Sequence, residues 1–148
     1  MKVFIGADHQ GFELKADLKR YLKMSGYDLE DDGDEKLDPN DDFPVFASRL
    51  AKDILVSNDK HARGILICGS GQGMCMTANR FKGIRACMGY DIEAVRSARN
   101  DDDCNVLCLP AKFLTADKAN ILVETFLNTD FADAPRFKRR IEQMDDLT

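Results

Sequence analysis

The segment Gly64-Ile65-Leu66-Ile67-Cys68-Gly69-Ser70-Gly71-Gln72-Gly73-Met74 decides the fold. Its first five residues are the most apolar short run in the chain, which is typical of a strand in the middle of a parallel sheet. Three glycines at alternating positions follow and lead into a stretch with helical period. In an open α/β sheet the ligand lies beyond the carboxyl ends of the strands, so this turn is the first candidate site.

Other strand-like runs alternate with longer helical stretches on both sides of this segment. We expect strands at 2–6, 27–29, 64–68, 84–88 and 104–109, and helices at about 12–24, 44–56, 74–81, 91–99, 116–127 and 135–144. This alternation predicts a doubly wound α/β fold with a mostly parallel five-stranded sheet. The length of 148 residues suits one domain, 1–148.

The composition bounds the class of protein. It is 44% hydrophobic and 32% charged with a net charge of -5, which suits a globular protein and disfavours nucleic acid as a partner. No apolar stretch is long enough to span a membrane, and no signal peptide is recognisable, so we expect a cytoplasmic protein. Five cysteines without CxxC spacing and only two histidines favour reduced thiols over disulfides or a zinc site.

The glycine turn after Cys68 can bind an anion. Backbone N–H groups that no side chain shields converge at a helix N-terminus, and a thiol at such a position is favoured as thiolate. The spacing matches neither a Walker A loop nor a dinucleotide fingerprint. The residues alone leave a second interpretation open, in which Cys68 is a small buried apolar residue at the end of a core strand.

Two other places carry candidate polar groups. Asp8 and His9 directly follow the first strand, where Asp8 could bind sugar hydroxyls and His9 could bind a phosphate or move a proton. Asp8 could instead cap the following helix. Near the C-terminus, Arg136 and Arg140 are spaced i, i+4 on a predicted helix, which suits a phosphate clamp but also an ordinary charged face.

Together, these and further motifs closely resemble the ribose-5-phosphate isomerase B family, which includes the galactose-6-phosphate isomerase subunits. The resemblance covers nearly the whole chain and is carried by Gly6-Ala7-Asp8-His9, Asp42-Phe43-Pro44, Ile67-Cys68-Gly69-Ser70-Gly71, Ala78-Asn79, Gly83-Ile84-Arg85-Ala86, Asn105-Val106-Leu107 and Arg136 with Arg140. It implies a three-layer α/β/α Rossmann-like domain without metal or organic cofactor. The implied partners are a phosphorylated sugar and a second copy of the chain, in a homodimer or tetramer with shared active sites.

The resemblance also implies a role for each site residue. Cys68 would carry the proton between C1 and C2 of the open-chain sugar, and Ser70 would help move the proton between O1 and O2. Backbone N–H groups of the loop would stabilise the enediolate, and the remaining residues would bind substrate. The loop residues are Gly69, Gly71, Gln72 and Gly73; the other substrate-binding residues are Asp8, His9, Asp102, Lys112, Arg136 and Arg140, with Lys112 in place of a family arginine.

The chain departs from the family pattern at the residue that opens the sugar ring. Anchored on Asn105, the position of the ring-opening histidine holds Asp101, and the following Asn position holds Asp102. Phe43 stands in a segment where relatives often have Tyr. Three explanations stay open: Asp101 is the acid, with a pKa raised by burial or by its acidic neighbours; a paralogous subunit supplies the missing group; or the substrate needs no ring opening.

The sequence therefore predicts an aldose–ketose isomerase of phosphorylated sugars that prefers acyclic substrates. One alternative is a non-catalytic or complementary subunit of a heteromeric isomerase. Another is a nucleotide- or flavin-binding module, because this architecture hosts many functions.

Overall fold

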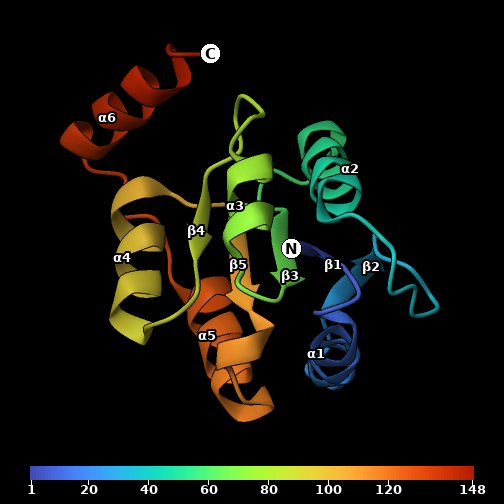
Figure 1. Cartoon of the computed structure of the whole chain (residues 1–148). Coiled ribbons are helices and arrows are strands. Elements are labelled where there is room, and N and C mark those ends of the chain that lie inside the picture. Colours follow the sequence, from blue (N-terminus) through green and yellow to red (C-terminus); the bar gives the residue numbers. More distant parts are fainter.

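A computed structural model describes residues 1–148 as a five-stranded sheet surrounded by helices (Figure 1). The strand order is β2-β1-β3-β5-β4, and every neighbouring pair is parallel, so the prediction of a mostly parallel sheet is confirmed. The strands are β1 (Lys2–Ala7), β2 (Asp28–Asp31), β3 (Arg63–Cys68), β4 (Ala86–Met88) and β5 (Val106–Pro110). The helices are α1 (Phe12–Met24), α2 (Phe43–Val56), α3 (Gln72–Ala78), α4 (Ile92–Asp102), α5 (Ala116–Asn128) and α6 (Pro135–Asp145), with a short 3-10 turn at Ala111–Phe113.

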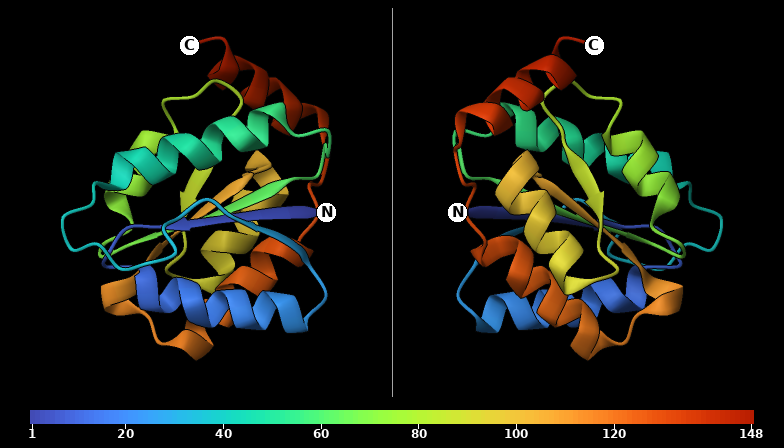
Figure 2. Two further views of the ribbon diagram at one scale, coloured as in Figure 1. Left: turned by 90° about the vertical axis from the view of Figure 1, so that its right-hand side faces the viewer. Right: turned by 90° about the vertical axis from the view of Figure 1, so that its left-hand side faces the viewer.

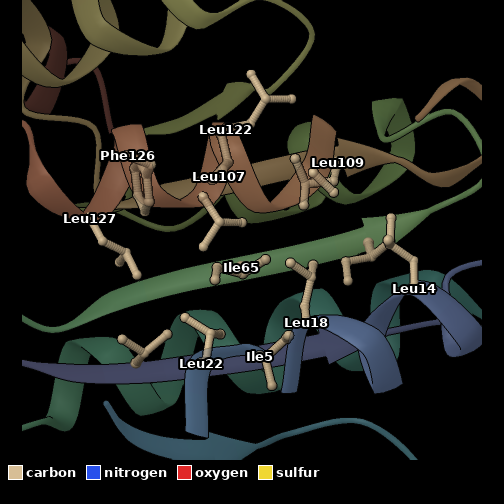
Figure 3. Close-up of a cluster of buried hydrophobic side chains, with 14 of the residues drawn as sticks. Ile5, Leu14, Leu18, Leu22, Ile65, Leu107, Leu109, Leu122, Phe126 and Leu127 are labelled. Atoms are coloured by element: carbon tan, nitrogen blue, oxygen red, sulfur yellow. The ribbon is translucent and has the colours of Figure 1, made fainter. Parts of the chain in front are cut away.

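Helices cover both faces of the sheet, which confirms the three-layer α/β/α arrangement. Helices α1, α4 and α5 lie on one face, and α2 and α3 lie on the other (Figure 2). On the first face, Ile5, Ile65 and Leu107 of the strands pack against Leu18 of α1 and Phe126 of α5 (Figure 3). Full burial of each such side chain stabilises the fold by about 1.5–3 kcal/mol.

The apolar spacing explains where the first helix packs and where it ends. Leu14, Leu18 and Leu22 recur every four residues and are buried against the sheet. Gly26 then adopts a φ of +82°, which a glycine accepts without the cost of a Cβ. The predicted helix at 12–24 is therefore confirmed with its bounds.

Several predicted bounds shift because of contacts between distant residues. Strand β4 begins at Ala86 rather than Ile84, because the side chain of Asn105 binds the N–H of Arg85 and the carbonyl of Gly83. Helix α3 ends at Ala78 rather than Phe81, and the Asn79 side chain that follows pairs with the main chain of Ala86. The bounds of β2, α4 and β5 and the start of α3 move by one to three residues at an end, and one end each of β1, β3, α2, α5 and α6 moves by a single residue.

The strand order places a crevice between β1 and β3. The chain passes from β1 outward to β2 in one direction, and from β3 in the other direction to the edge strand β4 before it returns inward to β5. Ligands bind at such a switch point, outside the carboxyl ends of the strands. Asp8 follows β1 there and its N–H binds the carbonyl of Ile67 at 3.2 Å, which brings Asp8 beside the end of β3.

No helix of the structure is both long enough and apolar enough to cross a lipid bilayer.

Candidate active site

A small polar pocket lies at the switch point of the sheet. Its volume is about 230 Å³, and it is lined by Asp8, Gln10, Phe43, Cys68, Gly69, Ser70, Gly73 and Lys112. Six of the residues predicted from the sequence and from the family resemblance line it: Asp8, Cys68, Gly69, Ser70, Gly73 and Lys112. Larger cavities exist elsewhere, but this one holds the predicted thiol.

The glycine loop directs a backbone N–H at the Cys68 thiol. The nitrogen of Gly71 lies 3.1 Å from Cys68 Sγ, so its N–H donates to the sulfur. Gly71 has a φ of +75°, and a Cβ there would come within 2.8 Å of Met88 Cε and 3.2 Å of Pro110 N. Only glycine can therefore make this turn without strain. Cys68 is buried, yet its residue lines the pocket.

The other two glycines of the loop leave room for side chains from neighbouring elements. A Cβ on Gly69 would lie 1.8 Å from Gln10 Oε1, and a Cβ on Gly73 would lie 2.6 Å from the ring of Phe43. Gln10 and Phe43 thus cover the loop from two sides and narrow the pocket.

Asp8 lines the pocket and also stabilises the turn that follows β1. Its Oδ1 accepts hydrogen bonds from the N–H groups of Gln10 (3.0 Å) and Gly11 (3.2 Å), which fixes the turn into α1. Gly11 itself is the N-cap residue, so Asp8 stabilises the turn before the helix rather than occupying the cap position. Burial raises the pKa of Asp8, and the two N–H donors oppose that rise.

His9 is held by a carboxylate from the acidic loop. Its Nδ1 lies 2.7 Å from Asp41 Oδ1, and its backbone N–H donates to the same oxygen at 3.0 Å. The hydrogen bond to Asp41 raises the pKa of His9. With Nδ1 occupied, Nε2 is the nitrogen that remains for a ligand.

Lys112 brings the positive charge of the pocket. It lies in the 3-10 turn after β5, and its N–H binds the carbonyl of Gly69 at 3.0 Å. Ser70 and Lys112 both line the pocket, and Ser70 Oγ accepts a bond from the N–H of Gln72 at 3.3 Å. A sugar phosphate would thus meet a hydroxyl and an ammonium group beside the thiol.

The remaining predicted residues lie at the other end of the sheet. Asp101 and Asp102 end α4, and Asp102 lines a separate cavity of about 580 Å³ together with Met144 and Asp145 of α6. Burial and the neighbouring Asp101 raise the pKa of Asp102, whereas Arg140 lowers it, so Arg140 belongs to this second group. Figure 2 shows α6 on the side of the N-terminus, where the strands begin, whereas the Cys68 pocket lies where they end. One chain therefore does not bring Asp101, Asp102, Arg136 and Arg140 to Cys68.

Sequence reasoning did not identify Asp41, Gln10 or Phe43 as site residues. Phe43 belongs to a motif that carries the family resemblance and Gln10 directly follows another, and this was a usable signal. Asp41 is one of seven aspartates between Asp28 and Asp42, and nothing in the sequence distinguishes the one that reaches His9.

Two sets of side chains have the spacing of metal ligands. Asp8, His9 and Asp41 form one at the edge of the pocket, and Glu30, Asp32 and Asp53 form the other outside it. Ligand atoms within each set lie within 4.8 Å of one another.

The sequence matches the ribose/galactose isomerase family over residues 3–144, so the chain belongs to this family. It is 40% identical over 143 residues to the probable ribose-5-phosphate isomerase B of Mycoplasma genitalium, an alignment that covers 96% of this chain and 92% of that protein. The crystal structure of ribose-5-phosphate isomerase B from that organism with bound ribulose 5-phosphate superposes with a TM-score of 0.92 and 37% identity, covering 99% of this chain and 95% of that one. A further relative, the 4-deoxy-4-sulfo-D-erythrose isomerase of Clostridium sp. MSTE9, is 35% identical over 90% of this chain and 82% of its own length.

The family membership and the fold together define the chain as a sugar-phosphate isomerase. The prediction of the enzyme class is thereby confirmed.

Proposed function

We propose that the protein interconverts an aldose and a ketose phosphate with Cys68 as the base. The observation that carries this proposal is the Gly71 N–H at 3.1 Å from Cys68 Sγ, in a pocket that also holds Ser70 and Lys112. A cysteine thiolate in such a pocket can take a proton from carbon.

The substrate and these residues supply every proton and electron pair that the reaction needs. The Cys68 thiolate removes the proton from C2 of the aldose, and the C–H electron pair becomes the C1–C2 double bond of an enediolate. The charge that develops on O1 is stabilised by N–H groups of the Gly69–Gly73 loop, where preorganised donors lower the barrier most. Ser70 moves a proton between O2 and O1, and the Cys68 thiol returns its proton to C1 to give the ketose.

We propose that the preferred substrate is acyclic. Asp101 stands at the position of the ring-opening histidine, and its Oδ1 accepts a hydrogen bond from the Asn100 amide at 2.8 Å. The relative named for 4-deoxy-4-sulfo-D-erythrose supports this choice, because a tetrose with sulfonate at C4 has no hydroxyl there to close a ring. Ribulose 5-phosphate and erythrose 4-phosphate are the corresponding phosphate substrates without a five-membered ring.

We further propose that two copies of the chain complete each site. A single chain separates the thiol pocket from Arg136 and Arg140, and helix α6, which contacts α4 at the edge of the molecule, keeps most of its residues exposed (Figure 1). A partner helix that reaches the pocket would supply the arginines for the phosphate. The same separation suits a paralogous partner, and the subunit composition of the active enzyme distinguishes the two assemblies.

Replacement of Cys68 tests the proposed base. Cys68→Ala is expected to lower kcat for ribulose 5-phosphate by at least about 10³-fold while ribulose 5-phosphate still raises the melting temperature of the variant. Cys75→Ala is the matched control, because Cys75 is a half-buried cysteine of α3 that does not line the pocket. Retained turnover in Cys68→Ala would exclude the thiol as the base.

A further inference from the structure

A second group of carboxylates lies outside the active-site pocket, between the edge strand β2 and helix α2. Glu30 is in β2, and Asp32 continues the strand with its N–H on the carbonyl of Ile5 at 2.8 Å. Alternate residues of a strand share a face, so both side chains face the helix that carries Asp53. One carboxylate oxygen from each of the three residues lies within 4.8 Å of the others.

Asp32 is the buried member of this group, and one of its carboxylate oxygens has no hydrogen-bond partner. It is 5% exposed, and its Oδ2 is buried without any hydrogen bond. Arg49 donates to the main-chain carbonyl of Asp32 at 2.8 Å rather than to its carboxylate. A buried carboxylate oxygen left in this state is costly, because native proteins pair such groups with a donor or a cation.

The surroundings of the group are acidic and open to water on one side. Glu30 and Asp53 line a groove of about 430 Å³ whose wall also includes Asp28 and Asp59. Lys2 pairs with Oε2 of Glu30, so the second oxygen of this carboxylate remains for another ligand. Asp53 lies in the last turn of α2, where the helix dipole also favours positive charge.

We propose that Glu30, Asp32 and Asp53 bind a divalent cation of the Ca²⁺ or Mn²⁺ type. Carboxylate oxygens are the ligands that such hard cations prefer, and oxygens around one Ca²⁺ at 2.3–2.6 Å lie at most about 5 Å apart. Asp32 would form the floor of the site, Glu30 and Asp53 its walls, and water from the groove would complete the coordination. The ion would tie β2, at the edge of the sheet, to α2.

Thermal unfolding in the presence of the metal alone tests the site. The measurement is made at pH 8, because burial and the facing Asp53 carboxylate raise the pKa of Asp32 to about 7. CaCl₂ or MnCl₂ at about ten times its Kd is expected to raise the melting temperature by about 4 °C over the value in EDTA at equal ionic strength. Electron paramagnetic resonance should then count one bound Mn²⁺ per chain.

Matched variants locate the ion. Asp32→Asn and Asp53→Asn are each expected to lose the metal-dependent rise, whereas Asp28→Asn, which removes the same charge from the same groove, is expected to keep it. In EDTA, Asp53→Asn should be at least as stable as the parent, because an amide facing Asp32 relieves charge repulsion and can donate to its free oxygen. Loss of the response in that variant is therefore not a failure to fold.

Two results would overturn the proposal. One is a parent protein whose melting temperature does not respond to either cation. The other is a response that persists in both Asp32→Asn and Asp53→Asn, which would place the ion elsewhere, for example at Asp8, His9 and Asp41.

Discussion

Asp41 Oδ1 binds both the ring Nδ1 and the backbone N–H of His9, at 2.7 and 3.0 Å, although 32 residues separate the two side chains. One carboxylate oxygen thus fixes the orientation of the imidazole at the edge of the pocket. It also connects the acidic loop to the turn that follows β1. The histidine therefore depends on a residue that does not itself line the pocket.

Asp41→Asn is expected to lower the pKa of His9. The hydrogen bond to the carboxylate favours the imidazolium and raises the pKa, and an amide cannot replace that charge. Chemical-shift titration measures this directly, since the chain has two histidines and the resonance of His61 provides an internal control. An unchanged titration midpoint for His9 would contradict the proposed pair.

The same pair makes stability depend on pH. Because the pKa of His9 is raised in the folded state, the pair stabilises the protein fully below the unfolded value near 6.5 and this contribution is lost as pH rises through the folded value. Urea unfolding at pH 5.5 and pH 9 checks the direction of this pH dependence. The difference in free energy of unfolding between the parent and Asp41→Asn should be larger at pH 5.5 than at pH 9.

Gly71→Ala is expected to impair both stability and turnover. A left-handed residue with a Cβ costs about 1–2 kcal/mol, and the contacts with Met88 and Pro110 add a steric cost of about 1–3 kcal/mol. The shifted N–H would no longer reach Cys68, so kcat should fall by about 10²-fold. Gly26→Ala is the matched control, because Gly26 has a φ of +82° with nothing within 4 Å of its Cβ position. In that variant the free energy of unfolding, measured with urea, should fall only by the cost of the left-handed backbone, and its activity should be unchanged.

The sequence was sufficient for the parts of the fold that depend on local patterns. Leu14, Leu18 and Leu22 predicted one face of α1, and the apolar run 64–68 predicted the central strand, because burial imposes these periods on the sequence itself. The order of the strands was not predictable, since parallel strands at different places in the sheet share the same apolar pattern.

The candidate site was predictable only in part, for a related reason. Cys68 and Asp8 could be predicted because residues after adjacent parallel strands meet at one edge. The bond between His9 and Asp41 depends on the path of a loop, and the shortened β4 depends on the Asn105 side chain. Arg140 lies near the beginning of the strands and the pocket lies at their carboxyl ends. No sequence motif indicates this separation.

Substrate preference tests whether the ring-opening step is missing. We expect kcat/KM to be at least about 10-fold higher for erythrose 4-phosphate than for ribose 5-phosphate, because only the latter is held as a furanose; the value for ribulose 5-phosphate is tied to that for ribose 5-phosphate by the equilibrium constant of their interconversion. Asp101→Asn should leave the rates on the two acyclic substrates unchanged, because these substrates need no ring-opening acid. Initial rates with all three substrates give the comparison, and equal efficiency on ribose 5-phosphate would contradict the preference.

A mixture of two inactive variants tests whether sites are shared between copies. Cys68→Ala removes the proposed base from the pocket, whereas Arg140→Ala removes a proposed phosphate ligand from α6, at the opposite end of the same chain. In a mixed dimer one site would combine both damaged halves and the other would combine both intact halves. With random pairing half of the dimers are mixed, and one of the two sites in each is intact, so the mixture should regain about a quarter of the parent kcat per chain after unfolding and refolding together.

Refolding each variant alone is the control, and it should give no gain. If the mixture is no more active than the average of its components, each site is built within one chain and Arg140 acts on the pocket of its own subunit or not at all.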